Sequence, residues 1–302
     1  MAAGKHAKEK KKPSALRVVL ILLIVALTGV FCVSGYMLAR EWISDAADKS
    51  AFDELSDLRR RAIEKAGEKE TSSETARPAD PGKSGDQPAG TASSEGESET
   101  GAEDTPEGSD AVMLAYRELA EMNPDLFGWL IIEDTPIDYP VMYTPKNEEY
   151  YLRRGFDKKY SYSGVPFMDV GCPPDGNHYL IYGHNMKNQT MFGTLPKYLK
   201  KDYWEKHQII RFDTLNEARE YQVIAAFRSK AYSKSDTGVF RYYAYADLSK
   251  EERFESYVKN VLRESAFKTG LTAEWGDELL TLSTCDYYTE NGRCVVVAKR
   301  IK

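Results

Sequence analysis

The feature that most constrains the fold of this chain is a series of eight short β-prone runs, separated from one another by turn-forming residues. Short strands bounded by turns are typical of a β-sandwich or a β-barrel. The last two runs form a candidate hairpin, because Asn291-Gly292 between them is a turn signal. The eight predicted strands are residues 127–132, 137–141, 165–168, 179–182, 209–212, 221–227, 279–284 and 295–301.

Three amphipathic patterns predict helices around these strands, at residues 111–122, 194–207 and 249–267. Ser249 and Glu252 have the spacing of a capping box at the start of the third helix. The expected fold is therefore mainly β with peripheral helices, and the globular domain is expected to cover residues 111–302.

An apolar run at residues 18–38 predicts a transmembrane helix, since twenty-one residues span about 32 Å, enough to cross a bilayer core. Six basic residues and one acid precede the run, so the positive-inside rule places the tail 1–17 in the cytoplasm and the rest of the chain outside. The alternative is a signal peptide cleaved after residues 33–35, but the run exceeds the usual apolar core of such peptides.

Two segments separate this run from the globular domain. Residues 39–70 read as a helical stalk, for which a solvated helix is favoured over a partner surface. Residues 71–110 hold ten acids and two bases and no Val, Ile, Leu, Met, Cys or aromatic residue, so they are expected to be a disordered tether. Their local charge of −8 accounts for the net charge of −6, and no basic, aromatic patch suggests nucleic-acid binding.

The candidate hairpin brings a thiol and a cation together. Cys285 ends the first strand and Arg293 opens the second, so their side chains are expected to meet, and a nearby cation favours the reactive thiolate. A disulfide between Cys285 and Cys294 is the alternative, although alternation turns Cys294 to the opposite face. Cys172 reads as a loop thiol without a visible partner.

His184 is the candidate base, because it follows a predicted strand and a glycine and therefore stands at a strand end. His178 and His207 are interpreted as structural or solvated. Asp169 and Asp286 are weaker candidates for an orienting carboxylate. No metal site is expected, because the chain lacks C-x-x-C, H-x-x-x-H and H-E-x-x-H patterns.

Together, these residues and their neighbours resemble class B sortases, the membrane-anchored cysteine transpeptidases of Gram-positive bacteria. Each matching piece is short, but their order along residues 111–302 and the preceding anchor agree with that family. The pieces are Asn123-Pro-Asp-Leu-Phe-Gly-Trp129, Asp138-Tyr-Pro-Val141, Tyr150-Tyr-Leu152, Phe167-Met-Asp169, Tyr182-Gly-His-Asn-Met186, Met191-Phe-Gly193, Thr281-Leu-Ser-Thr-Cys285 and Arg293.

The resemblance implies an eight-stranded sortase β-barrel with additional N-terminal helices. It also implies a catalytic set of His184, Cys285 and Arg293 that works without a cofactor. The implied substrates are a secreted surface protein with a C-terminal sorting motif and an amino group of a peptidoglycan precursor. The neighbouring Asn185, Ser283 and Thr284 are expected to line the peptide groove.

Other functions stay open on the sequence. A sortase could polymerise pilins, or act as an endopeptidase with water as the acceptor. A papain-like hydrolase fits poorly, because its cysteine precedes its histidine whereas His184 here precedes Cys285. A non-enzymatic surface module remains an alternative in which Cys285 is unreactive.

Overall fold

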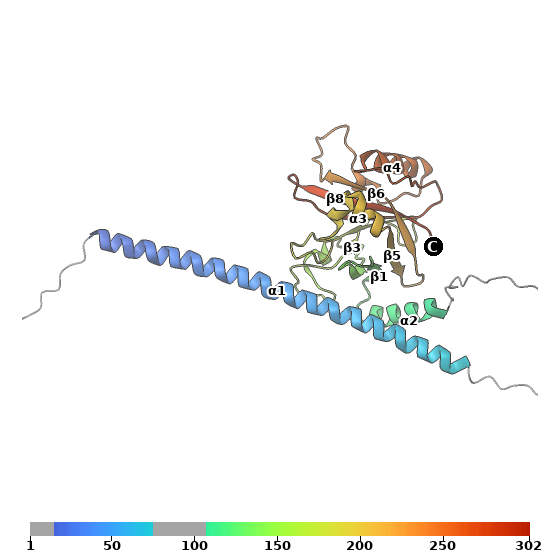
Figure 1. Cartoon of the computed structure of the whole chain (residues 1–302), viewed down its shortest axis with the longest axis horizontal. Coiled ribbons are helices and arrows are strands. Elements are labelled where there is room, and N and C mark those ends of the chain that lie inside the picture. The colour runs from blue at the N-terminus through green and yellow to red at the C-terminus, as the bar shows by residue number, and fades with distance from the viewer. Residues whose placement is uncertain (1–14, 75–106) are drawn as a thin grey trace, which may run out of the picture. The chain divides into compact units, whose positions relative to one another are not determined.

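The structure, a computed structural model, describes residues 15–74 and 107–302 (Figure 1). The chain divides into two compact units, one before Asp48 and one running from Asp48 to Lys302. The helix α1 (Ala15–Glu74) begins in the first unit and ends in the second. Its apolar stretch Leu22–Arg40, which lies in the first unit, is long and apolar enough to cross a membrane. The predicted basic tail falls largely outside the described residues.

The second unit is built on a closed eight-stranded barrel, as predicted. The strand order around the barrel is β1-β2-β3-β4-β7-β8-β6-β5. Every one of the eight predicted runs contains a strand, with ends that differ by a few residues. The strands are β1 (Leu126–Ile131), β2 (Asp138–Met142), β3 (Phe167–Met168), β4 (His178–Tyr182), β5 (Ile209–Thr214), β6 (Glu220–Lys230), β7 (Leu279–Cys285) and β8 (Gly292–Arg300).

The order of the strands matters most where the chain crosses from β4 to β7. These two strands run parallel, and Tyr182 lies beside Ser283. A parallel pair needs a long connection, and β5, β6 and the helix α4 (Glu251–Glu264) lie within it. β7 then pairs with β8 in antiparallel fashion. The C-terminal ends of β4 and β7 and the start of β8 therefore meet at one end of the barrel.

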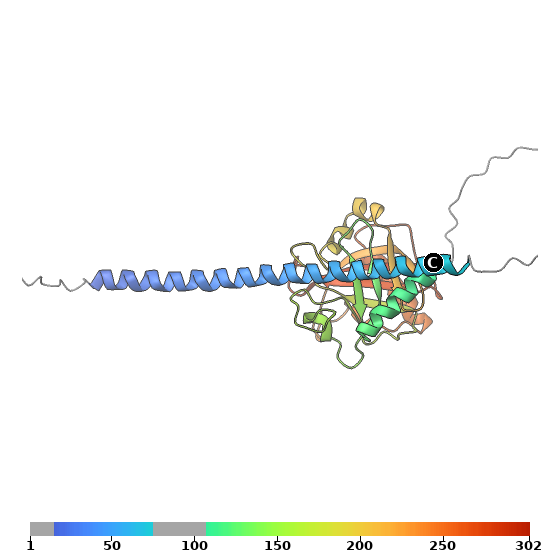
Figure 2. The ribbon, with the colours of Figure 1, turned by 90° about the horizontal axis from the view of Figure 1, so that it is seen from below.

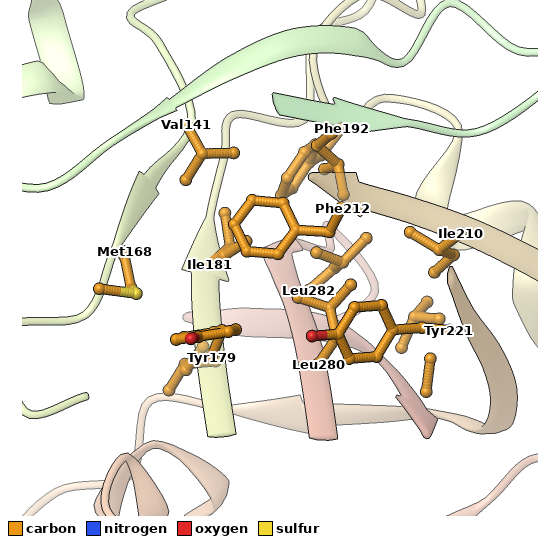
Figure 3. Close-up of a cluster of buried hydrophobic side chains, with 14 of the residues drawn as sticks. Val141, Met168, Tyr179, Ile181, Phe192, Ile210, Phe212, Tyr221, Leu280 and Leu282 are labelled. Atoms are coloured by element: carbon orange, nitrogen blue, oxygen red, sulfur yellow. The ribbon is translucent and has the colours of Figure 1, made fainter. Parts of the chain in front are cut away.

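Large apolar side chains fill the barrel (Figure 3). Phe212 of β5, Ile181 of β4 and Leu282 of β7 point toward one another and are fully buried. Their burial supplies the hydrophobic free energy that closes the sheet, at about 25 cal/mol per Å² of apolar surface. The aromatic rings of Phe212 and Tyr179 add an edge-to-face contact at 5.7 Å between centroids.

Two of the predicted helices differ from expectation. Residues 194–207 form a 3-10 helix, η2 (Leu195–Leu199), and a separate helix, α3 (Lys201–Lys206), joined by an extended residue. Tyr198 and Trp204 are both buried, and on one straight helix their side chains would point about 120° apart, so the break lets both face the barrel.

The predicted capping box is wrong, because Lys250 is the N-cap of α4 and no side chain caps it. Ser249 instead lies outside the helix, where its backbone N–H donates to Asp247 Oδ1 at 2.9 Å. The helix ends at Glu264 rather than Phe267, and α4 packs against β6 (Figure 1).

The part of α1 that belongs to the second unit is not a solvated stalk, which corrects the sequence interpretation. Phe52 and Leu55 are 6% and 7% exposed, and the Phe52 ring meets Tyr139 of β2 edge to face at 5.2 Å. Arg59 bonds to Asp138 at 3.3 Å and donates to the Tyr116 hydroxyl at 3.2 Å. Tyr116 belongs to α2 (Glu107–Met122), which lies beside this part of α1 in Figure 2.

This packing changes the interpretation of the predicted tether. Residues 75–106 lie outside the described residues, and they join two helices whose described residues pack on the same unit. The chain therefore reaches the barrel through α1, before the acidic segment begins. In the sequence, the acidic segment therefore lies between two helices that both pack on the second unit, and its predicted disorder stays a prediction.

The packing of α1 can be tested by shortening Phe52. We expect Phe52→Ala to lower the free energy of unfolding of the second unit by about 3 kcal/mol, because it leaves a cavity beside Tyr139. Glu54→Ala, at an exposed position of the same helix, is the matched control and should change stability by no more than about 0.5 kcal/mol. Equal denaturation midpoints for the two variants would contradict the packing of Phe52 and favour the solvated stalk instead.

Candidate active site

The candidate site lies where three neighbouring strands end or begin. Cys285 is the last residue of β7, Arg293 is the second residue of β8, and His184 follows β4 by two residues. These strands are adjacent in the barrel, so residues 101 and 109 positions apart from His184 along the chain reach the same end of the sheet.

Cys285 and Arg293 are direct partners in the antiparallel ladder, as the hairpin predicted. Side chains at directly opposite positions have Cβ atoms about 5 Å apart and share one face of the sheet. Asn291 adopts the left-handed conformation with φ 55°, which makes the turn that sets this register. Arg293 Nη1 donates to the carbonyl oxygens of Asn291 and Gly292 at 3.3 and 3.0 Å, which leaves Nε and Nη2 donors for a substrate oxygen.

The residues on either side of His184 are hydrogen-bonded to the end of β7, the strand that carries Cys285. The Gly183 N–H donates to the Ser283 carbonyl at 3.2 Å, and Thr284 Oγ1 donates to the Gly183 carbonyl at 2.7 Å. Asn185 Nδ2 donates to the Cys285 carbonyl at 2.7 Å. A glycine is required before His184, because a Cβ at position 183 would lie 2.7 Å from the Phe192 ring.

The imidazole of His184 has a defined orientation. Its Nε2 lies 2.9 Å from the Leu152 carbonyl oxygen, which can only accept a hydrogen bond. Nε2 therefore carries the proton, and Nδ1 is the basic nitrogen of the neutral ring. Burial lowers the pKa of His184 below its ordinary 6.5, the Leu152 hydrogen bond partly opposes this shift, and the nearby positive charge of Arg153 adds to it.

A cavity of about 430 Å³ opens over these residues. His184, Cys285 and Arg293 all line it, so the structure brings the three predicted catalytic residues together. The other side chains that line it include Tyr182, Tyr242, Tyr243, Phe167, Leu152, Ser283, Thr284, Glu148, Glu149 and Asp169. Burial and the neighbouring Asp169 and Glu149 raise the pKa of Glu148, so carboxylates give one part of the cavity an acidic character.

The residues predicted to line a peptide groove have different positions. Ser283 and Thr284 line the cavity but are almost completely buried, and the Ser283 hydroxyl is hydrogen-bonded to Tyr242 at 2.7 Å. Asn185 supports the backbone of Cys285 and does not line the cavity.

Neither candidate carboxylate orients His184. Asp286 forms an ion pair with Arg228 at 2.9 Å, and Asp169 accepts a hydrogen bond from the Tyr182 hydroxyl at 2.7 Å. The orienting acceptor is the Leu152 carbonyl, which sequence reasoning missed. A backbone carbonyl acceptor cannot be recognised from residue type, although Leu152 belongs to Tyr150-Tyr-Leu152, one of the motifs that resemble class B sortases.

The remaining thiols and histidines have structural surroundings. Cys172 and Cys294 are free and buried, and burial raises the pKa of the Cys172 thiol to about 12. His178 is buried between the Tyr245 carbonyl and Thr281 Oγ1, and desolvation lowers its pKa to about 4. Among the described residues, no group of three or more His, Cys, Asp or Glu side chains is arranged to hold a metal ion.

The fold and the site define a cysteine transpeptidase of the sortase type, and comparison with known proteins agrees. The family model for the sortase domain matches residues 130–301. Sortase B of Listeria monocytogenes is 31% identical over 189 residues, which cover 61% of this chain and 73% of that protein.

Solved structures are similar as well. A Staphylococcus aureus sortase B–substrate complex matches with a TM-score of 0.54 and 30% identity, over 62% of this chain and 85% of that one. A mutant form of Clostridium perfringens sortase B matches with a TM-score of 0.57 and 28% identity, over 64% and 89%. The chain belongs to the sortase family and is a class B sortase.

The lowered pKa of His184 predicts where the acid limb of the pH profile of kcat/KM should lie. Protonation of the free enzyme at His184 removes the base, and the limb of kcat/KM should therefore lie below pH 6.5. The positive charge of Arg153 disfavours the imidazolium form of His184. Arg153→Gln removes this charge, so the pKa of His184 should rise and the acid limb should move to higher pH.

Arg154→Gln is the matched control for Arg153→Gln. Arg154 stacks on the Tyr150 ring and is not among the charges that shift the pKa of His184. An acid limb that stays in place in both variants, or moves equally in both, would contradict the assignment of this limb to His184.

Proposed function

We propose that this chain is a membrane-anchored enzyme that cleaves a sorting-motif peptide of secreted surface proteins and joins it to an amino group of a peptidoglycan precursor. The observation that carries the proposal is the direct cross-strand pairing of Cys285 with Arg293, beside His184, on one cavity. The cavity supplies room for a peptide, and the three side chains supply a nucleophile, a proton carrier and a fixed positive charge.

In the first half of the reaction, Nδ1 of His184 takes the proton of the Cys285 thiol. The thiolate attacks the scissile carbonyl carbon, and the resulting oxyanion accepts hydrogen bonds from Arg293, whose charge is permanent at physiological pH. The C–N bond then breaks, the leaving amine takes the proton from the His184 imidazolium, and the peptide remains on Cys285 as a thioester.

In the second half, the acceptor amine attacks the thioester and passes a proton to neutral His184. The carbon–sulfur bond breaks, and Cys285 leaves as the thiolate, which regains the proton from His184. Ser283 and Thr284 would form a wall of the peptide site, and Asn185 would hold the Cys285 backbone in place. The substrate complex solved for Staphylococcus aureus sortase B supports a peptide as the bound partner.

The apolar helix at Leu22–Arg40 supports anchoring at the cell membrane. Six basic residues precede it, at positions 5, 8, 10, 11, 12 and 17, which supports a cytoplasmic N-terminus by the positive-inside rule. The catalytic unit would then face the cell wall, where both substrates are found.

The proposal is tested with the full chain in detergent and a panel of fluorogenic peptides that carry candidate sorting motifs. Each peptide is incubated with and without an amine acceptor, and the products are identified by mass spectrometry. We expect cleavage of at least one motif and a product that carries the acceptor amine. Hydrolysis alone would identify an endopeptidase, and no cleavage of any peptide would overturn the proposal.

A further inference from the structure

Asp48, at the start of the second unit, is bonded to a loop close to the active site. Its Oδ2 accepts a hydrogen bond from Ser161 Oγ at 2.8 Å and another from the Ser163 N–H at 3.0 Å. Ser161 and Ser163 are each 3% exposed. Two hydrogen bonds from buried donors to a carboxylate are charge-assisted, so they are stronger than hydrogen bonds between neutral groups.

The same loop lies against Leu152, the residue whose carbonyl orients His184. Ser161 Oγ also accepts from the Gly164 N–H at 2.9 Å, which closes a turn. Gly164 has φ +59°, and a Cβ there would lie 2.5 Å from the Leu152 carbonyl oxygen. Only a glycine lets the turn approach this carbonyl so closely. The Val165 N–H then donates to the Tyr151 carbonyl at 3.1 Å.

The loop depends on such contacts, because it has little regular structure of its own. It joins the 3-10 helix η1 (Tyr150–Arg153) to β3, and Arg154 and Tyr160 form an isolated bridge within it. Segments with few ladder hydrogen bonds are those that open locally at low free energy. The Asp48 carboxylate adds two hydrogen bonds from outside the loop, at Ser161 and Ser163.

We propose that Asp48 is a positioning residue for His184. It orders the turn Ser161–Gly164, the turn supports the Leu152 carbonyl, and this carbonyl holds the Nε2–H tautomer of His184, which leaves Nδ1 as the base. This inference rests on the catalytic role of His184 proposed above. It gives one residue of α1, Asp48, an indirect part in positioning the imidazole, although Asp48 lies far in sequence from residues 111–302.

The experiment compares Asp48→Ala with Asp48→Asn in the full chain in detergent. Without the carboxylate, a displaced Leu152 carbonyl should lower kcat of peptide cleavage roughly tenfold, with little change in KM, because misplaced catalytic groups cost rate. Asparagine keeps an oxygen that can accept both hydrogen bonds, so Asp48→Asn should retain kcat within about threefold of the original chain.

A second readout separates positioning from loss of stability. The tautomer of His184 is measured by NMR in chains labelled with ¹⁵N-histidine, and its signals are identified by their loss in His184→Ala. We expect the Nε2–H tautomer in the unsubstituted chain and in Asp48→Asn. In Asp48→Ala we expect a mixture of the two tautomers. Ser56→Ala is the matched control, because Ser56 lies on the same helix but bonds to Asp138 at 3.1 Å. It should leave kcat and the tautomer unchanged.

Several results would overturn the inference. One is an Asp48→Ala variant with the original kcat and a single Nε2–H tautomer, and another is an equal loss of kcat in Ser56→Ala. If Asp48→Ala does not fold, Ser161→Ala takes its place, since it removes one of the two donors and the acceptor of Gly164. An original chain that cleaves no peptide refutes the proposed function instead, while the tautomer comparison still tests the contact.

Discussion

Cys285→Ala is expected to lower the rate of peptide cleavage by about 10⁴-fold or more, because no other group on the cavity can form the thioester. Ser283 and Thr284 precede Cys285 on β7 and carry hydroxyls, but both are buried, and their hydroxyls are hydrogen-bonded to Tyr242 and the Gly183 carbonyl respectively. The measurement is the initial rate on the peptide that the original chain cleaves, together with the mass of the enzyme after incubation.

Cys294→Ala is the matched control for this variant. Cys294 lies on the adjoining strand at the position after Arg293, is fully buried, and burial raises the pKa of its thiol far above the usual range. The change should cost about 1 kcal/mol of stability through lost packing and leave the cleavage rate unaltered. Cleavage that survives Cys285→Ala, or is lost equally in both variants, would exclude Cys285 as the nucleophile.

Arg293→Ala is expected to lower kcat by roughly 10²- to 10³-fold, the usual cost of removing one oxyanion donor. The loss should fall on kcat more than on KM, because the oxyanion exists only in the transition state and the intermediate. Arg293→Lys keeps the charge but not the planar fork of donors, so we expect it to recover only part of the rate.

The control for Arg293 lies on the same strand. Lys299 of β8 pairs with Asp277 at 3.5 Å and is six residues from Arg293, at the other end of the strand. Lys299→Ala removes an equal charge from the same strand and should leave kcat unchanged. If Arg293→Ala instead raised KM alone, Arg293 would bind the peptide in its ground state rather than stabilise the oxyanion.

Much of the fold followed from local sequence patterns. The eight short runs became eight strands because their β-branched and aromatic residues are bounded by turn residues, and turn chemistry is local. The pairing of Cys285 with Arg293 was predictable for the same reason, since a short hairpin fixes its own register. Errors appeared where tertiary packing overrode a helical pattern, as in the break between η2 and α3.

The prediction of a solvated stalk at residues 39–70 was wrong because an amphipathic pattern does not identify the surface that the apolar face contacts. Phe52 and Leu55 formed an apolar stripe in the sequence, but a stripe shows only that a face can be buried, and not which surface buries it. Tyr139 and Asp138, which receive this helix, are more than eighty residues away in the chain.

The sequence by itself determined the strands and the apolar helix, because these depend on residue type and short-range spacing. Residue type and spacing also singled out Cys285, His184 and Arg293 as candidates, and their catalytic roles were implied by the resemblance to class B sortases. Only the tertiary structure decided that β4 and β7 run side by side, which brings His184 to Cys285. It also decided that the Leu152 carbonyl orients the imidazole and that Asp48 reaches the loop behind it. Such contacts join backbone atoms or residues that are distant in the sequence. Their partners are set by how the strands and connections are arranged in the folded barrel, which no local sequence pattern reveals.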